Sequence, residues 1–143
     1  MDASTPIEGT LGRALRERGQ RVTPQRLAIA GVVAELDRHV TAEHVFAEVS
    51  RRMPGVSLPT VYATLELLEQ LGLVRRVSAG AGSAVYDGRV EEHHHLVCRE
   101  CGAIADIDAP VDRAGLLAAA QAGGFAPDYS EVVVRGLCGS CAA

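Results

Sequence analysis

All four cysteines of this chain fall into two C-x-x-C pairs, and this pattern constrains the fold more than any other feature of the sequence. Cys98 and Cys101 form the first pair, and Cys138 and Cys141 form the second after 36 intervening residues. Each pair lies in a glycine-containing turn, which suits a backbone that wraps thiolates around a cation. The spacing predicts one four-thiolate zinc site to which both pairs contribute.

Two other interpretations of the cysteines are possible. The first is two disulfides, which form in proteins that a signal peptide directs to an oxidising compartment. The start of this chain lacks a basic segment followed by an apolar one, so no signal peptide is expected. A C-x-x-C pair can also be a thioredoxin-like redox motif, but that motif needs one pair that opens a helix after a strand. The presence of two pairs favours zinc over both alternatives.

Three consecutive histidines precede the first cysteine pair. On a strand, His93 and His95 would point to one face and His94 to the other, because side chains alternate along a strand. An H-x-H pair of this kind can hold one metal ion. The alternative is a solvated loop or a short tract with nonspecific affinity for metals.

Composition indicates a soluble, globular protein with two different halves. Apolar residues make up 48% of the chain, enough for a core, and no apolar run approaches 18 residues, so we expect no membrane helix and a reducing cytoplasm. The net charge of −4 is unevenly distributed. Residues 1–80 hold 10 Arg against 9 acidic residues, and residues 81–143 hold 4 against 9. The halves are therefore expected to have different roles.

The first half predicts helices over residues 8–19, 24–36, 41–52 and 57–71. Thr23, Thr41 and Ser57 are N-cap residues for the last three, residues 37–40 form a loop, and Gly19 closes the first helix. Apolar runs at 73–77 and 84–86 around a turn at 78–82 indicate a β-hairpin. The last three of these helices, followed by a hairpin, match the winged-helix arrangement. In that arrangement the helix over 57–71 would enter a DNA major groove.

The second half predicts a small α/β domain. Residues 87–92 are polar and acidic, so the expected domains are 1–86 and 87–143 with a hinge at about 86–92. Strands are expected at 93–98, 103–107 and 131–137, with a helix at about 111–122. A unit this small cannot rely on its core alone, so zinc is the expected staple. The apolar strand that begins at Glu131 favours pairing with a second copy, and hence a homodimer.

Five segments together resemble a known family in their order and spacing, over nearly the whole chain. These segments are residues 18–26 (RGQRVTPQR), 39–43 (HVTAE), 60–65 (TVYATL), 93–102 (HHHLVCRECG) and 136–141 (GLCGSC). They resemble the ferric uptake regulator family. The resemblance implies an α+β fold: an N-terminal winged-helix DNA-binding domain and a C-terminal α/β dimerisation domain with the four-cysteine structural zinc. It also implies a regulatory metal site between the two domains.

The resemblance is greatest to the peroxide-sensing branch of the family and to actinobacterial regulators of catalase genes. By position, it places the regulatory metal ligands on His39, Asp87, His93, His95 and Asp106. The iron-sensing branch typically carries Glu at the position of Asp106. Three imidazoles and two carboxylates suit Fe(II), Mn(II) or Zn(II). The family's other frequent metal site has no good ligand set here, since its positions hold Glu92, His94, Arg113 and Ser130.

The DNA contacts implied by the resemblance lie in the first half. Arg21 is at the position that reaches into a minor groove, and Thr60, Tyr62 and Ala63 lie on the reading helix. Ala63 stands where relatives often carry Arg or Asn, which puts the operator sequence in doubt. The expected partner is double-stranded operator DNA. His44 and His94 are expected on the surface.

These observations predict a metal-dependent dimeric repressor that senses peroxide and releases DNA when a ligand histidine is oxidised. The zinc site uses every cysteine, so no free thiol remains to act as the sensor. The alternative within the family is an iron- or zinc-responsive repressor that is insensitive to peroxide. A zinc hydrolase that uses His93 and His95 is the competing class, but the chain has no H-E-x-x-H motif, so no enzyme is expected.

Overall fold

The computed structural model describes residues 5–36, 39–77 and 84–143, which pack into two compact units. The N-terminal unit is Met1–Val90 and the C-terminal unit is Glu91–Ala143. In the described part of the chain, every helix is too short or too polar to cross a membrane. The elements of the N-terminal unit are α1 (Thr5–Glu17), α2 (Pro24–Glu35), β1 (His39–Thr41), α3 (Ala42–Arg52), α4 (Leu58–Gln70), β2 (Arg75–Val77) and β3 (Val85–Asp87). Those of the C-terminal unit are β4 (His94–Cys98), β5 (Ile104–Ile107), α5 (Arg113–Ala122), β6 (Val133–Gly136) and α6 (Gly139–Ala142).

Helices α2, α3 and α4 begin at the three predicted caps. The hydroxyl of Thr23 accepts a hydrogen bond from the backbone N–H of Arg26, and the hydroxyl of Thr41 accepts one from His44. Ser57 caps α4 in the same way. A side-chain oxygen is favourable at these positions because the first N–H groups of a helix have no partner within it.

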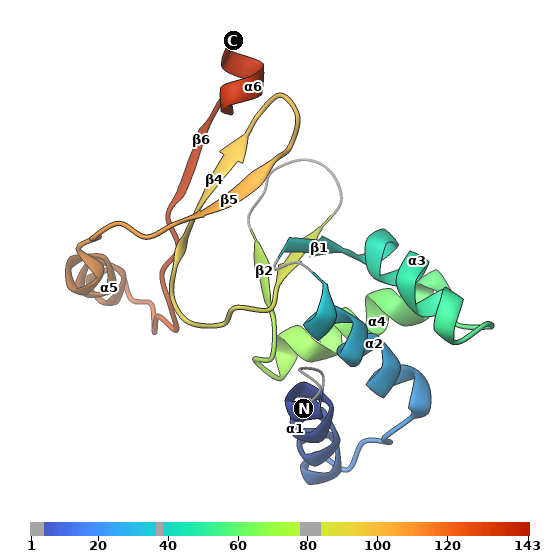
Figure 1. The fold of residues 1–143 in the computed structure, drawn as a ribbon. Helices are drawn as coiled ribbons and strands as arrows, with labels where there is room; N and C mark the ends of the chain where they lie inside the picture. Colours follow the sequence, from blue (N-terminus) through green and yellow to red (C-terminus); the bar gives the residue numbers. More distant parts are fainter. Residues whose placement is uncertain (1–4, 37–38, 78–83) are drawn as a thin grey trace. The chain divides into compact units, whose positions relative to one another are not determined.

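The core of the N-terminal unit is built from one apolar face of each helix. Figure 1 shows α1 beside α2, with α4 behind α2 and α3 to the right. On α4, Val61, Leu65 and Leu68 form a buried stripe at helical spacing, and Leu58 at the start of the helix is partly buried. Leu67, which lies off that stripe, is also buried because α4 packs against both α2 and α3. The buried face of α4 is therefore wider than one stripe.

The N-terminal unit contains a three-stranded antiparallel sheet in the order β1-β3-β2. The hairpin strands β2 and β3 confirm the predicted wing, although its turn lies outside the described residues. The expected loop at 37–40 was wrong for its second half, because His39 and Val40 belong to β1. Val40 pairs with Tyr86 of β3, and both side chains are almost fully buried. A strand of three residues is too short to show an alternating pattern in the sequence.

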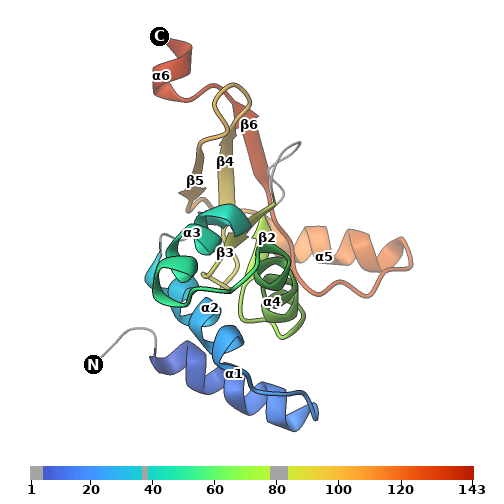
Figure 2. The same cartoon turned by 90° about the vertical axis from the view of Figure 1, so that its right-hand side faces the viewer.

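The C-terminal unit contains a second three-stranded sheet, in the order β5-β4-β6. Strand β5 runs antiparallel to β4 and β6 runs parallel to it, and β5 and β6 are the two edge strands. Helices α5 and α6 lie at opposite ends of this sheet (Figures 1 and 2). The three strands and α5 lie within the ranges predicted from the sequence, whereas the short helix α6 was not predicted. The α+β fold class is confirmed.

The C-terminal unit buries very few side chains. Of its residues, all of which the structure describes, only His93, His95, Val97 and Cys98 are buried. The large apolar side chains that remain exposed in the described part of the chain all belong to this unit: Leu96, Leu116, Phe125, Tyr129, Val134 and Leu137. A sheet with so little covered apolar surface cannot be stable alone.

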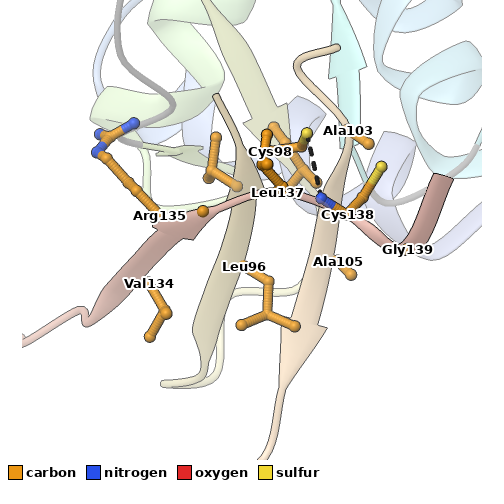
Figure 3. Close-up of a pocket in the computed structure, with 12 residues that line it drawn as sticks. Leu96, Cys98, Ala103, Ala105, Val134, Arg135, Leu137, Cys138 and Gly139 are labelled. Carbon is orange, nitrogen blue, oxygen red and sulfur yellow. Dashed lines mark hydrogen bonds between the residues drawn. The ribbon is translucent and has the colours of Figure 1, made fainter. Parts of the chain in front are cut away.

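One face of this sheet carries an apolar hollow of about 400 Å³. Leu96 on β4 lies between Ala105 on β5 and Val134 on β6, as the strand register requires and Figure 3 shows. By alternation, His95 and Asp106 lie on the opposite face. The sheet thus separates an apolar face from a face that carries metal-ligand side chains.

Candidate metal centres and nucleic-acid interface

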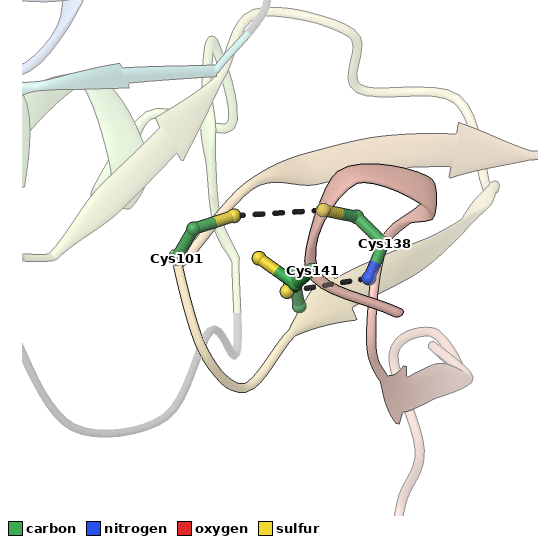
Figure 4. Close-up of side chains that lie close together, drawn as sticks. Cys101, Cys138 and Cys141 are labelled. Carbon is green, nitrogen blue, oxygen red and sulfur yellow. Dashed lines mark hydrogen bonds between the residues drawn. The ribbon is translucent and has the colours of Figure 1, made fainter. Parts of the chain in front are cut away.

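The two cysteine pairs meet at one end of the C-terminal sheet. Cys98 is the last residue of β4 and Cys101 lies in the following turn, which Gly102 closes at φ +77° with a hydrogen bond from its N–H to the Cys98 carbonyl. Cys138 caps α6 and Cys141 lies within it. Figure 4 shows the side chains of Cys101, Cys138 and Cys141 directed toward one another.

The sulfur positions fit a tetrahedral ion. All four Sγ atoms lie within 4.8 Å of one another, and those of Cys101 and Cys138 are 3.8 Å apart. A zinc ion with Zn–S bonds near 2.3 Å sets its sulfurs about 3.8 Å apart. The four cysteines form no disulfide. This arrangement favours a four-thiolate metal site over the disulfide interpretation.

The backbone around the cluster also supports thiolates. Hydrogen bonds from the backbone N–H groups of Cys101 and Cys138 lower the pKa of the Cys98 thiol to about 6. Hydrogen bonds with the neighbouring cysteines, Cys138 first, raise the pKa of Cys141 to about 12. Several thiolates cannot share so small a volume without a cation, and a bound metal removes the protons outright. The cluster is therefore built for a cation.

A second group of metal-ligand side chains lies on the face of the C-terminal sheet opposite the apolar hollow. The Nε2 atoms of His93 and His95 are each 3.5 Å from Oδ1 of Asp106, and the two rings are 4.6 Å apart. Both imidazoles are buried, at 6% and 3% exposure. As predicted from strand alternation, His93 and His95 share one face.

The hydrogen-bond partners of His93 and His95 favour a proton on Nδ1 of each ring. His93 donates from Nδ1 to the backbone carbonyl of Glu91 at 2.7 Å, because a carbonyl can only accept. The Nδ1 of His95 lies 3.0 Å from the carboxylate of Glu131, again an acceptor. Neutral rings with the proton on Nδ1 carry the metal-binding lone pair on Nε2, the atom nearest Asp106.

The Nδ1 of His94 is a hydrogen-bond acceptor, unlike those of His93 and His95. It accepts a hydrogen bond from the backbone N–H of Val132 at 3.0 Å. His94, expected on the surface, is half-buried, and His44 is exposed as expected. The bond ties β4 to the segment that leads into β6, a pairing that the sequence alone does not reveal.

The remaining two predicted ligands lie together in the N-terminal unit. His39 of β1 and Asp87 of β3 are cross-strand partners, with His39 Nε2 at 3.4 Å from Asp87 Oδ2. The Asp87 side chain is fully buried, and its other oxygen accepts a hydrogen bond from the N–H of Arg89. Asp87, expected in the hinge, instead belongs to the sheet of the N-terminal unit.

The positions of the family's other metal site are occupied by internal contacts. The Glu92 carboxylate pairs with the Arg113 guanidinium and accepts a hydrogen bond from the N–H of Ser130. A cationic side chain thus lies where a metal ligand would be needed. This geometry agrees with the sequence-based conclusion that the position lacks a good ligand set.

A polar groove of about 540 Å³ lies between residues 20–26 and α4 in the N-terminal unit. Three of the four predicted DNA-contact residues line it, namely Arg21, Thr60 and Ala63. The fourth, Tyr62, instead donates its phenol O–H to the carboxylate of Glu43 on α3 at 2.6 Å. This bond lowers the pKa of Glu43 and raises that of Tyr62.

Sequence reasoning missed two residues next to these sites. Glu131 supports His95, and Glu43 holds Tyr62. An acidic residue at the start of an otherwise apolar strand was the available signal for Glu131. Its partner depends on the parallel β4–β6 pairing, which spacing does not specify. For Glu43, the 19-residue separation from Tyr62 gives no local pattern.

The fold and the sites define a class of protein, a winged helix joined to a metal-binding unit. The Ferric uptake regulator family matches residues 17–126 of the chain. "Ferric uptake regulation protein 1" of Mycolicibacterium fortuitum is 45% identical over 120 residues, 83% of this chain and 74% of that protein. The "Peroxide operon regulator" of Bacillus subtilis is 33% identical over 128 residues, covering 89% and 88%.

A solved structure has the same fold. The Helicobacter pylori ferric uptake regulator Fur superposes with a TM-score of 0.80 at 18% identity, over 98% of this chain and 94% of that one. The chain therefore belongs to the ferric uptake regulator family, whose members are metal-dependent transcriptional regulators that bind operator DNA as dimers. These regulators are not enzymes, so the zinc-hydrolase interpretation is set aside.

Proposed function

We propose that this protein is a cytoplasmic, dimeric repressor that binds operator DNA when metal-loaded and releases it on reaction with peroxide. The four clustered cysteines would hold the structural zinc, and the histidines and aspartates would hold a regulatory Fe(II) or Mn(II). The observation that carries the proposal is the placement of two imidazoles, His93 and His95, whose Nδ1 atoms lie against hydrogen-bond acceptors and whose Nε2 atoms lie beside Asp106.

The regulatory site is proposed to draw ligands from both units. His39 and Asp87 would come from the wing sheet, and His93, His95 and Asp106 from the C-terminal sheet. Each set is already in contact within its own unit. An ion shared by both sets would restrict the angle between the units, and in a dimer that angle sets the spacing of the two reading helices. Metal binding would then favour the DNA-binding arrangement.

The proposed response to peroxide takes place at a ligand histidine. Bound Fe(II) would donate the electrons that cleave the O–O bond of peroxide and would regain them from the imidazole ring as that ring is oxidised. One peroxide oxygen adds to a ring carbon of a ligand imidazole and the other leaves as water. The altered ring is a poorer ligand, so the two units are no longer held together and DNA is released. The similarity to the B. subtilis peroxide regulator supports this proposal.

Dimerisation is proposed to occur through the C-terminal unit. Its exposed apolar side chains and the open edge of β6 need a cover, and a second copy supplies one. The N-terminal unit has a well-buried core and no comparable apolar surface among its described residues. The dimer would therefore place two independent reading units on one operator.

The test is DNA binding by protein loaded with zinc and either Fe(II) or Mn(II), before and after hydrogen peroxide. A duplex selected from a random library by the Mn(II) form serves as the operator. We expect peroxide to release DNA only from the Fe(II) form, with one added oxygen on a peptide that contains His39, His93 or His95. Release without that mass gain, or equal release with Mn(II), would instead support an iron- or zinc-responsive repressor that is insensitive to peroxide.

A further inference from the structure

The imidazole of His95 lies between two carboxylates from the neighbouring strands. Its Nδ1 is 3.0 Å from Oε1 of Glu131, and its Nε2 is 3.5 Å from Oδ1 of Asp106. Glu131 lies two residues before Val133, the register partner of His95, so both side chains extend from the same face of the sheet. All three groups are largely buried: the exposed fractions are 4% for the His95 side chain, 15% for Glu131 and 14% for Asp106.

His95 and His93 are supported by different groups. The Nδ1 of His93 faces a backbone carbonyl, whereas the Nδ1 of His95 faces the carboxylate of Glu131. A charged acceptor makes a stronger hydrogen bond than a neutral one. It also makes the opposite ring nitrogen more basic, which strengthens that nitrogen as a ligand. The two adjacent imidazoles are therefore unequal donors.

We propose that Glu131 is a positioning residue for the regulatory metal site. It holds His95 with its proton on Nδ1 and its lone pair on Nε2 toward Asp106, and so raises the affinity of the site for a divalent cation. This inference rests on the proposed regulatory role of His95. Glu131 acts through His95 and is not itself a ligand, since its carboxylate is on the far side of the ring from Asp106.

The backbone supports this assignment. The N–H of His95 donates to the carbonyl of Val132 at 3.0 Å, and the N–H of Val132 donates to the ring of His94. These two bonds fix the segment from which Glu131 projects relative to the histidine strand. Glu131 is therefore placed by two hydrogen bonds on Val132, the residue that follows it in the chain.

The experiment compares zinc-loaded, full-length wild type with Glu131→Gln and Glu131→Val, and uses Glu100→Gln in the exposed turn as a matched control. Long-range ¹H–¹⁵N spectra of histidine-labelled protein, recorded before Mn(II) is added, report which ring nitrogen of His95 is protonated. Mn(II) affinity is then measured by titration. The absorption spectrum of Co(II) at the same site reports whether the ligand set changes.

We expect Nδ1 protonation of His95 in the wild type and in Glu131→Gln, whose amide oxygen still accepts the hydrogen bond. Glu131→Val should lose this preference and bind Mn(II) about 10- to 100-fold more weakly, the range for groups that orient metal ligands. Glu131→Gln should fall between the wild type and Glu131→Val and should keep the wild-type Co(II) spectrum. The Glu100→Gln control should match the wild type.

Three results distinguish a failure of the proposed role of Glu131 from a failure of the proposed function. A His95 ring protonated on Nε2, or wild-type Mn(II) affinity in Glu131→Val, overturns the role of Glu131. A Co(II) spectrum altered by Glu131→Gln shows that Glu131 is a direct ligand and also overturns the positioning role. A wild-type protein that takes up no Mn(II) beyond its zinc overturns the proposed function itself.

Discussion

The phenol of Tyr62 on α4 donates a hydrogen bond of 2.6 Å to the carboxylate of Glu43 on α3. Both residues are near the start of their helices. Glu43 lies in the first turn of α3, where a negative side chain interacts favourably with the positive end of the helix dipole. The bond fixes the direction of the only aromatic ring on α4. Tyr62 is a proposed DNA contact, so Glu43 bears on how the protein distinguishes operators.

Glu43→Ala should reduce the ratio of specific to nonspecific DNA binding several-fold, because the ring of Tyr62 loses its fixed direction. Glu43→Gln should keep that ratio, since the amide oxygen can still accept from the phenol. Anisotropy titrations of the operator and a scrambled duplex measure both affinities. Equal ratios in the wild type and both variants would show that the bond has no part in recognition.

Arg21→Ala should weaken DNA binding and flatten its dependence on salt. The Arg21 side chain is exposed beside the polar groove of α4, while its carbonyl accepts a hydrogen bond from the Arg26 guanidinium. Loss of one arginine–phosphate contact lowers the slope of log K against log salt by about 0.9. Arg99→Ala, in an exposed turn of the C-terminal unit, is the control and should leave affinity and slope unchanged. An unchanged slope in Arg21→Ala argues against its placement at the DNA.

Cys98→Ser should remove the structural zinc and with it the folded C-terminal unit. Structural zinc contributes on the order of 10 kcal/mol of apparent folding free energy in small domains. Elemental analysis should find one zinc per chain in the wild type, and analytical ultracentrifugation should find a dimer. Ser140→Ala, between the cysteines of the second pair, should retain both. A Cys98→Ser protein that stays folded and dimeric contradicts the zinc assignment.

The helix caps show how far the sequence alone could predict this structure. Thr23, Thr41 and Ser57 act within three residues of the chain, so their roles can be inferred from order alone. The cysteine spacing likewise predicted a cluster that the structure contains. Contacts such as His95–Glu131, 36 residues apart, depend on strand pairing and could not be predicted. Strand β1 was missed for the same reason, because its burial comes from β3 and not from its own sequence.

Thr41→Ala should destabilise the N-terminal unit by about 1 kcal/mol, because α3 loses its capping oxygen. The same residue ends β1, two positions after His39, so fraying there should also disturb the His39–Asp87 contact. Thr41→Asp restores a cap and should recover most of the stability. Urea unfolding followed by circular dichroism gives both values, and equal losses in the two variants would rule out a capping role.

Asp87→Asn should lower the affinity for the regulatory metal at least tenfold while the fold is kept, because ligating groups and their close partners typically have effects of about 10- to 100-fold. The amide oxygen of Asn can still accept from the Arg89 N–H. Asp87→Ala, by contrast, leaves that N–H without its acceptor and should cost about 1–3 kcal/mol of stability. Asp128→Asn, on an exposed segment, is the control for Mn(II) titrations. Unchanged Mn(II) affinity in Asp87→Asn would exclude Asp87 as a ligand.

The few buried side chains of the C-terminal unit have a consequence for the lifetime of the protein in a cell. Three of the four, His93, His95 and Cys98, are candidate metal ligands and not apolar residues. A newly made chain that has not acquired its metals therefore has little to hold this unit closed, and its backbone is open to proteases. Proteases would then degrade chains that lack one or both metals. The number of regulator molecules in the cell would therefore depend on the supply of metal.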